Sequence, residues 1–372
     1  MHLPFLMSIQ DMLVLARPVQ APPGRIVGPI AAIFGHILNF LFNLVYAITP
    51  NNSLGFAIIL LTIIAMIIML PLGVKSQRSM ANMQKLNPEV EKIKAKYGGS
   101  KDPEIQKKIQ QETQALYAKH KVNPLGGCLP MLIQMPLFFG LLFIMQNSFM
   151  YVDTLHNVYI ELAGAIQAVP GYLDIVGPMH WQFVPERWWE NNVLIQHYYS
   201  MGMTYEQAVA HVGGNHINLA TPEHLARVLD RFQSEHWQAL FAAIPDAYLP
   251  RIHELYEHRN VIVVFFGLPL LENSGLTWPG IIVPFMTVIT TLGQSWIMQL
   301  VNKPKDDRAK TQQTMMMVVM PVFMGFITVT MPAGVGLYWI FSNLFRLIQQ
   351  LVMNKQQGVK FRLPFIKPSE LD

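Results

Sequence analysis

Four long stretches of this 372-residue chain contain no Asp, Glu, Lys, Arg or His: residues 53–74, 124–150, 276–302 and 311–345. A helix of about 20 apolar residues is long enough to cross the roughly 30 Å hydrocarbon core of a membrane. The last stretch contains Met331-Pro-Ala-Gly334, a turn signal that divides it into two helices. The pattern therefore predicts an all-α polytopic membrane protein with five transmembrane helices.

Basic residues lie on one side of these predicted spans. Residues 75–121 carry eleven Lys plus Arg against five acids, whereas no lysine occurs between Lys121 and Lys303. Loops rich in Lys and Arg stay in the cytoplasm. The first span is therefore predicted to run from outside to inside, which places the N-terminus outside and the C-terminus in the cytoplasm.

These signals together divide the chain into segments. The predicted order is an external tail (1–25), an interfacial amphipathic helix (26–50), a first span (53–74), a cytoplasmic helical hairpin (75–122), a second span (124–150), an extracytoplasmic helical insert (151–275), a third span (276–302), a cytoplasmic loop (303–313), a fourth span (314–330), a fifth span (333–354) and a cytoplasmic tail (355–372).

The cytoplasmic hairpin is predicted from two apolar stripes at helical spacing. Gly98 and Gly99 interrupt the pattern, and Asp102-Pro103 is a typical start for the second helix. The segment is either a solvated connector or a basic platform for lipid headgroups, a ribosome or an emerging chain. Composition does not separate these two interpretations.

The insert at 151–275 is predicted to fold into a small helical domain. Trp181, Trp188, Trp189 and Trp237 provide core material, and Thr221-Pro222-Glu223 is a good helix start. Nine of the 12 histidines lie here, but their spacing is poor for one helix face and no HExxH motif occurs. Surface histidines are therefore expected, with no metal site, and a docking surface for partner proteins is a further hypothesis.

Several separated motifs resemble the YidC/Oxa/Alb family of membrane protein insertases. They are Pro71-Leu72, the Pro- and Gly-rich segment 123–136, Met320-Pro-Val322, and 332–343 with Gln349-Gln350. The resemblance covers roughly residues 30–150 and 262–357. It implies five helices around a hydrophilic groove that is open to the cytoplasm and the lipid and closed to the outside.

The resemblance also implies a function: an insertase and chaperone that passes nascent membrane proteins into the bilayer. The ribosome and the Sec translocon are expected partners by resemblance only. Membrane lipids are also expected partners, and no specific recognition of nucleic acid is expected. The chain has no phosphate-binding loop, so neither an enzymatic step nor a cofactor is predicted.

Polar side chains inside the predicted spans are the candidate groove residues. Each has a competing structural interpretation, because Ser and Thr bond to their own helix and Gln or Asn can link two helices. The candidates are Thr62, Met66, Gln134, Thr287, Thr291, Gln294, Ser342 and Asn343.

Met66 is a departure from the family. An arginine usually lies five residues before the Pro-Leu that ends the first span, and this chain has Met66 there. Attraction of acidic substrates by that arginine is therefore not expected. The candidate residues at the cytoplasmic rim and hairpin are Lys75, Arg78, Lys92, Lys94, Lys107 and Lys108. Lys75 and Arg78 lie nearest for electrostatic attraction, although their interpretation as ordinary positive-inside anchors is favoured.

Other functions fit the sequence less well. A transporter would place an acid or base at midmembrane and show paired repeats, and an intramembrane protease would need Asp or His in its spans. An assembly factor that binds folded subunits rather than nascent chains remains the main alternative.

Overall fold

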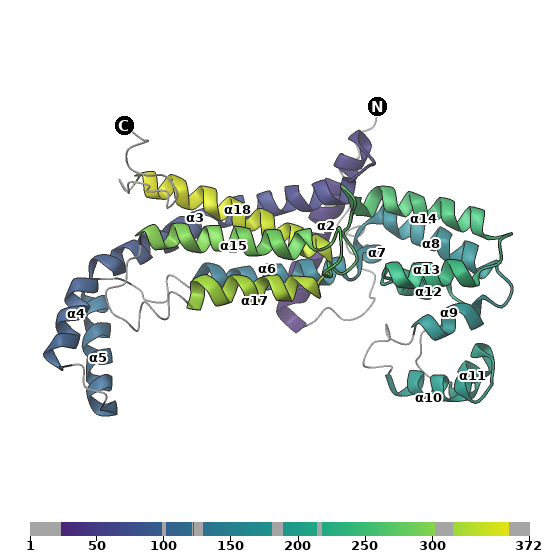
Figure 1. The fold of residues 1–372 in the computed structure, drawn as a ribbon, viewed down its shortest axis with the longest axis horizontal. Coiled ribbons are helices and arrows are strands. Elements are labelled where there is room, and N and C mark those ends of the chain that lie inside the picture. The colour runs from purple at the N-terminus through teal and green to yellow at the C-terminus, as the bar shows by residue number, and fades with distance from the viewer. Residues whose placement is uncertain are drawn as a thin grey trace. The chain divides into compact units, whose positions relative to one another are not determined.

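A computed structural model describes residues 24–98, 102–120, 122, 129–180, 189–213, 218–301 and 315–356. The predicted tail at 1–25 lies almost entirely outside these residues, as do the loop at 303–313, most of the tail at 355–372 and the motif residues 123–128. The described chain is helical apart from one short hairpin, which confirms the predicted helical class (Figure 1).

The helices follow in a simple order. They are α2 (Gly24–Ile48), α3 (Ser53–Lys85), α4 (Asn87–Lys96), α5 (Pro103–Lys119), α6 (Leu129–Met145), α7 (Ser148–Tyr151), α8 (Asp153–Gln167), α9 (Tyr172–His180), α10 (Trp189–Ser200), α11 (Tyr205–Val212), α12 (Pro222–Leu229), α13 (Ser234–Ala243), α14 (Leu249–Val263), α15 (Ile282–Val301), α17 (Met320–Val329) and α18 (Ala333–Gln356). Strands β1 (Val264–Phe265) and β2 (Leu268–Pro269) pair antiparallel, and a π-helical turn, Met315–Val319, precedes α17.

Two segments of the described chain are long and apolar enough to cross a membrane: Gly28–Ile48 in α2 and Ser53–Ser79 in α3. Shorter apolar helices cover Gln134–Met145, Ile282–Ile297 and Met317–Val329. The structure thus supports a helical membrane protein with two candidate spans. The five-span arrangement, and the interfacial position expected for residues 26–50, stay predictions.

The chain divides into two compact units. The described residues of the insert unit lie within 24–61, 138–288 and 322–340, and those of the hairpin unit lie within 62–137, 289–321 and 341–356. The predicted insert is therefore not a separate unit, because it shares one unit with parts of α2, α3, α6, α15, α17 and α18.

Within the insert unit, α8 packs against both α12 and α14 (Figure 1). Leu155, Leu162, Leu225 and Leu229 are fully buried there, because apolar residues recur at helical spacing on the facing sides of these helices. Trp237 on α13 is also buried, as predicted from the sequence. The side chains of the other three insert tryptophans lie outside the described residues.

The insert unit also joins the end of the insert to the turn between α17 and α18. The backbone N–H groups of Ala333 and Gly334 donate to the carbonyls of Glu272 and Leu270, both at 2.8 Å. Asn273 forms an antiparallel bridge with Pro332. The turn predicted at Met331-Pro-Ala-Gly334 is therefore fixed by backbone hydrogen bonds to the insert.

In the hairpin unit, α4 and α5 lie side by side (Figure 1). Asp102 caps α5 by accepting a hydrogen bond from the N–H of Glu104 at 2.9 Å, as predicted. Gly98 follows α4 with a φ of 58°, a left-handed conformation that glycine adopts without strain. A helical hairpin is therefore present, although α3 continues to Lys85 before it begins.

Candidate functional site

A polar contact joins α15 and α18 within the hairpin unit. The amide nitrogen of Asn343 donates to the hydroxyl of Thr291 at 2.9 Å and lies 3.3 Å from that of Thr290. Asn343 and Thr290 are buried, and Thr291 is partly buried. Away from water, a buried amide needs such partners. The pairing of Thr291 with Asn343 joins two predicted groove residues.

The side chain of Gln349 on α18 packs against α3 in the same unit. A Cβ on Gly73 would lie 2.8 Å from the amide nitrogen of Gln349, so this amide rests directly on the α3 backbone. Ser76 and Gln77 follow on α3, and Ser76 is 5% exposed. Among the described residues, the buried Gln77 Oε1 and Gln349 Nε2 have no hydrogen-bond partner. Each of these two amides therefore has one buried atom that no described neighbour satisfies.

The remaining groove candidates differ in how deeply they are buried. Thr62, Met66 and Ser342 are buried in the hairpin unit, while Gln134 and Gln294 are partly buried there. Thr287 is fully buried but belongs to the insert unit. The groove role of these residues stays a prediction.

All six predicted rim and hairpin cations are exposed: Lys75, Arg78, Lys92, Lys94, Lys107 and Lys108. The hairpin itself is held by Glu112, which accepts hydrogen bonds from Lys96 Nζ and the Tyr97 hydroxyl, each at 2.7 Å. The hydrogen bond from Lys96 is the main cause that holds the pKa of Glu112 below its usual value. The basic face of the hairpin is therefore left open to solvent.

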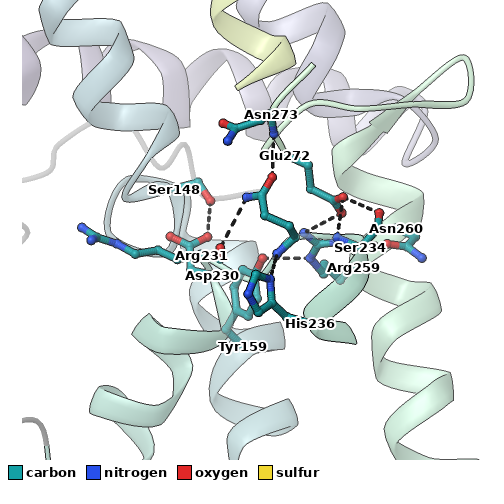
Figure 2. A network of polar contacts seen from close by, with 11 residues as sticks. Ser148, Tyr159, Asp230, Arg231, Ser234, His236, Arg259, Asn260, Glu272 and Asn273 are labelled. Atoms are coloured by element: carbon teal, nitrogen blue, oxygen red, sulfur yellow. Dashed lines mark hydrogen bonds and ion pairs between the residues drawn. The ribbon is translucent and has the colours of Figure 1, made fainter. Parts of the chain in front are cut away.

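The insert unit contains a cluster of buried charged side chains. We call Arg259, Tyr159 and Glu272 the buried charge network (Figure 2). Arg259 on α14 is fully buried, and its Nε donates to the Tyr159 hydroxyl at 2.8 Å. Its guanidinium carbon lies 5.4 Å from the Trp237 ring centroid and 5.7 Å from that of Tyr256. These faces favour a cation. Arg259 is thus enclosed by three aromatic rings.

Glu272 is the anionic partner of Arg259. One of its oxygens lies 3.9 Å from Arg259 Nη2, and the other accepts hydrogen bonds from the N–H and hydroxyl of Ser234. Glu272 is 5% exposed. Its backbone carbonyl is the group that binds Ala333, so the charge network is continuous with the α17–α18 turn.

Asp230 is a second buried acid of the insert unit. It accepts from the Ser148 hydroxyl at 2.6 Å and from the N–H of Phe149 at 3.2 Å (Figure 2). Burial raises the pKa of Asp230, and the hydrogen bond from Ser148 opposes this shift. This contact fixes α7 to the turn after α12.

The sequence interpretation missed three parts of these clusters. It omitted Thr290, although this residue precedes Thr291 on a helix that was already suspected. It cited Gln349 only as part of a motif. It singled out none of the Arg, Asp or Glu residues of the insert, of which Arg259, Asp230 and Glu272 are buried. In the sequence, only Trp237 indicated that a buried core lies close to these charged residues.

A family model described as "60Kd inner membrane protein" matches residues 45–169 and 233–360, more than half of the chain. Among individual proteins, the membrane protein insertase MisCA of Bacillus subtilis (strain 168) is 46% identical over 123 residues, which are 31% of this chain and 46% of that protein. The insertase YidC of Clostridium tetani (strain Massachusetts / E88) is 40% identical over 134 residues, 33% of this chain and 59% of that protein.

A longer relative gives a similar match. The membrane protein insertase YidC of Anaeromyxobacter sp. (strain Fw109-5) is 45% identical over 117 residues, 32% of this chain. The aligned part is 20% of that relative's length, so this chain matches about a fifth of it.

Proposed function

Because this chain belongs to the 60Kd inner membrane protein family, the YidC/Oxa insertases, we propose that it inserts nascent membrane proteins into the bilayer of the bacterial inner membrane. The observation that carries the proposal is the set of buried, uncharged polar side chains on α3, α15 and α18. The predicted spans in which they lie are mostly apolar, and polar groups inside a membrane are costly unless they serve contacts or a hydrated path.

The physical task is to move polar parts of a client past hydrocarbon. A charged or polar segment loses its hydration in the core, at a cost of several kcal/mol for each group. A groove lined by Thr, Ser, Asn and Gln replaces part of that hydration. Gln77 and Gln349, with their unsatisfied amide atoms, are suited to hydrogen bonds that a client forms and releases.

We further propose the finer arrangement that the charge pattern predicts. Five spans surround the groove, the N-terminus lies outside, and the hairpin and C-terminus are cytoplasmic. The exposed lysines of the hairpin then face the side from which ribosomes deliver clients. The transfer needs no catalysis or cofactor, because burial of the client's apolar span supplies the driving force. Sec translocon and ribosome are proposed partners on the strength of the family alone.

Photo-crosslinking tests this function. A photoreactive residue is placed at Met66, Gln134 or Thr291 and exposed to a ribosome-bound, single-span nascent chain. Phe285 on α15 is the control, because this residue is 59% exposed. The proposal predicts crosslinks from the first three positions and not from the control.

Other outcomes would count against it. Crosslinks from none of the three inner positions, with a folded protein in the membrane, would contradict insertion through this groove. Crosslinks to folded membrane subunits alone would instead favour the alternative, an assembly factor.

A further inference from the structure

The loop between β1 and β2 carries an exposed aromatic side chain in an uncommon backbone conformation. Phe266 and Gly267 form this two-residue loop, with φ values of 48° and 84°. Hairpin loops with positive φ at both residues favour Asn, Asp or Gly at the first position, and a bulky residue there is a genuine outlier. Phe266 is nevertheless 76% exposed. Strained residues of this kind cluster at functional sites, which points to a binding role for the ring.

The start of α3 holds this loop in place within the insert unit. The N–H of Phe266 donates to Asn52 Oδ1 at 2.6 Å. The Phe56 ring lies edge-on to the rings of Phe265 and Phe266, at centroid distances of 5.3 and 6.2 Å. Phe266 is therefore fixed beside the first turn of α3, where the candidate membrane span Ser53–Ser79 begins.

A second exposed aromatic side chain lies at the start of another predicted span. Trp278 is 79% exposed and precedes the first residue of α15 by four positions. Leu276 is 67% exposed, and Phe285 in the first turn of α15 is 59% exposed. Exposed large apolar side chains that gather in this way mark a surface that binds something apolar.

The sequence around these aromatic residues carries almost no charge. Between Arg259 and Lys303, the only Asp, Glu, Lys, Arg or His is Glu272, which is 5% exposed. Aromatic side chains are enriched where a protein crosses the boundary between membrane and water. In the proposed topology, α3 and α15 both begin at the extracytoplasmic face, so Phe266 and Trp278 lie at this boundary.

From these observations we propose that Phe266 and Trp278 form a membrane-surface anchor of the insert unit. Their rings enter the outer leaflet between the lipid headgroups and the hydrocarbon. The Trp278 ring suits this layer because it has an apolar body and one polar N–H, and the Phe266 ring contributes apolar area. The partner is lipid because both rings adjoin predicted spans that lipid surrounds. The proposal goes beyond client insertion and takes only the topology from the proposed function.

Fluorescence quenching in vesicles of phosphatidylethanolamine and phosphatidylglycerol tests where the two rings lie. The single cysteine of the full-length protein, Cys128, is replaced by serine. One new cysteine is introduced as Phe266→Cys, Trp278→Cys or the control Met201→Cys, and it carries an environment-sensitive fluorescent label. Met201 is a matched control because it is 66% exposed in the insert unit but adjoins no predicted span. Lipids spin-labelled near the headgroup quench from the membrane, and iodide quenches from water.

The expected result separates the anchor from the control. Labels at the two anchor positions lose about half of their emission or more to the spin-labelled lipid and are protected from iodide, because they lie in the interfacial layer. The label at the control position shows the reverse. In the unaltered protein, a phospholipid with a photoreactive group near its headgroup crosslinks to residues 264–281, which checks the result without any substitution.

A second measurement tests whether the rings act as an anchor. A label at Leu276→Cys reports the depth of the loop before α15. The pair Phe266→Gln and Trp278→Gln should lower its quenching by lipid about twofold and raise its quenching by iodide, because the loop loses its apolar contacts with the bilayer. The conservative pair Phe266→Tyr and Trp278→Phe should leave both values unchanged.

Several results would overturn the proposal. Quenching by iodide alone at position 266 or 278 would place that ring in water. Protection from both quenchers that disappears when the protein is diluted in the vesicles would assign the surface to a second copy, and protection that persists would assign it to another segment of this chain. Equal effects of the Gln pair and the conservative pair would show that the rings do not set the depth of the loop.

The proposed function fails separately from this proposal, because the labels report position whether or not a client inserts. Loss of client insertion with the lipid quenching intact would reject the insertase function and leave the anchor in place.

Discussion

The insert unit and the hairpin unit both bury polar side chains, but of different kinds. The insert unit buries charges that are paired: Arg259 with Tyr159 and Glu272, and Asp230 with Ser148. Arg259 Nη2 lies 3.9 Å from Glu272 and has no hydrogen-bond partner among the described residues, so its pairing is an ion pair. The hairpin unit buries neutral groups, and two of its amide atoms, on Gln77 and Gln349, have no partner among the described residues.

The difference follows from the cost of burying each kind of group. A buried charge that loses its partner costs several kcal/mol, so a charge network holds its members in one arrangement. A neutral amide or hydroxyl costs less and can exchange one partner for another. The paired charges of the insert unit are therefore suited to hold helix ends in place, and the neutral groups of the hairpin unit are suited to the client contacts that we propose.

The largest expected effect comes from breaking the buried charge network. Arg259→Ala leaves Glu272 buried without its cation and should destabilise the protein by about 3–5 kcal/mol. Thermal unfolding in detergent, followed by tryptophan fluorescence, measures the loss. Adding Glu272→Gln should recover part of it, since the neutral amide no longer needs a cation.

Arg251 provides a matched control for this change. It pairs with Glu161 and Glu254 at the surface, where water screens the charges, so Arg251→Ala should leave the midpoint unchanged. An equal shift of the unfolding midpoint for Arg251→Ala and Arg259→Ala would show that burial of the charge does not cause the loss of stability.

A pair of glycine substitutions gives the second test of the comparison. A Cβ at Gly280 would lie 1.7 Å from the backbone oxygen of Ser274, whereas a Cβ at Gly73 would meet only the end of the Gln349 side chain. Gly280→Ala should therefore destabilise the protein by about 1–3 kcal/mol or more. Gly73→Ala should cost under about 1 kcal/mol, because the amide can move aside. The same unfolding assay ranks the two, and the reverse order would contradict the proposed difference in rigidity.

The smallest effect on stability is expected in the neutral cluster. Asn343→Ala removes hydrogen bonds to Thr290 and Thr291, which are worth about 0.6 kcal/mol each inside a membrane. Its unfolding midpoint should shift little, while insertion of a single-span client should fall measurably. Thr328→Ala is a control, because that hydroxyl bonds only to carbonyls of its own helix among the contacts shown, at 2.9 and 2.8 Å. A fall in stability that matches the fall in insertion would make Asn343 a structural residue only.

Much of the fold could be predicted from local signals. Helical class followed from uncharged apolar stretches, the start of α5 from Asp102-Pro103, and the start of α12 from Thr221-Pro222. Each signal acts over a few residues, because capping and helix periodicity are local properties. Family membership followed from motifs that are also short.

The partners of buried polar groups were decided by the tertiary structure alone. Arg259 and Tyr159 are 100 residues apart, Ser148 and Asp230 are 82 apart, and Asn343 and Thr291 are 52 apart. In sequence, Arg259 lies in the polar run Glu257-His-Arg-Asn260 and resembles a surface residue. Whether a charge can be buried depends on which distant groups meet it when the chain folds, since only those partners offset its lost hydration. The sequence determined which helices form and that they belong in a membrane, and the packing of distant helices decided which polar groups have fixed partners.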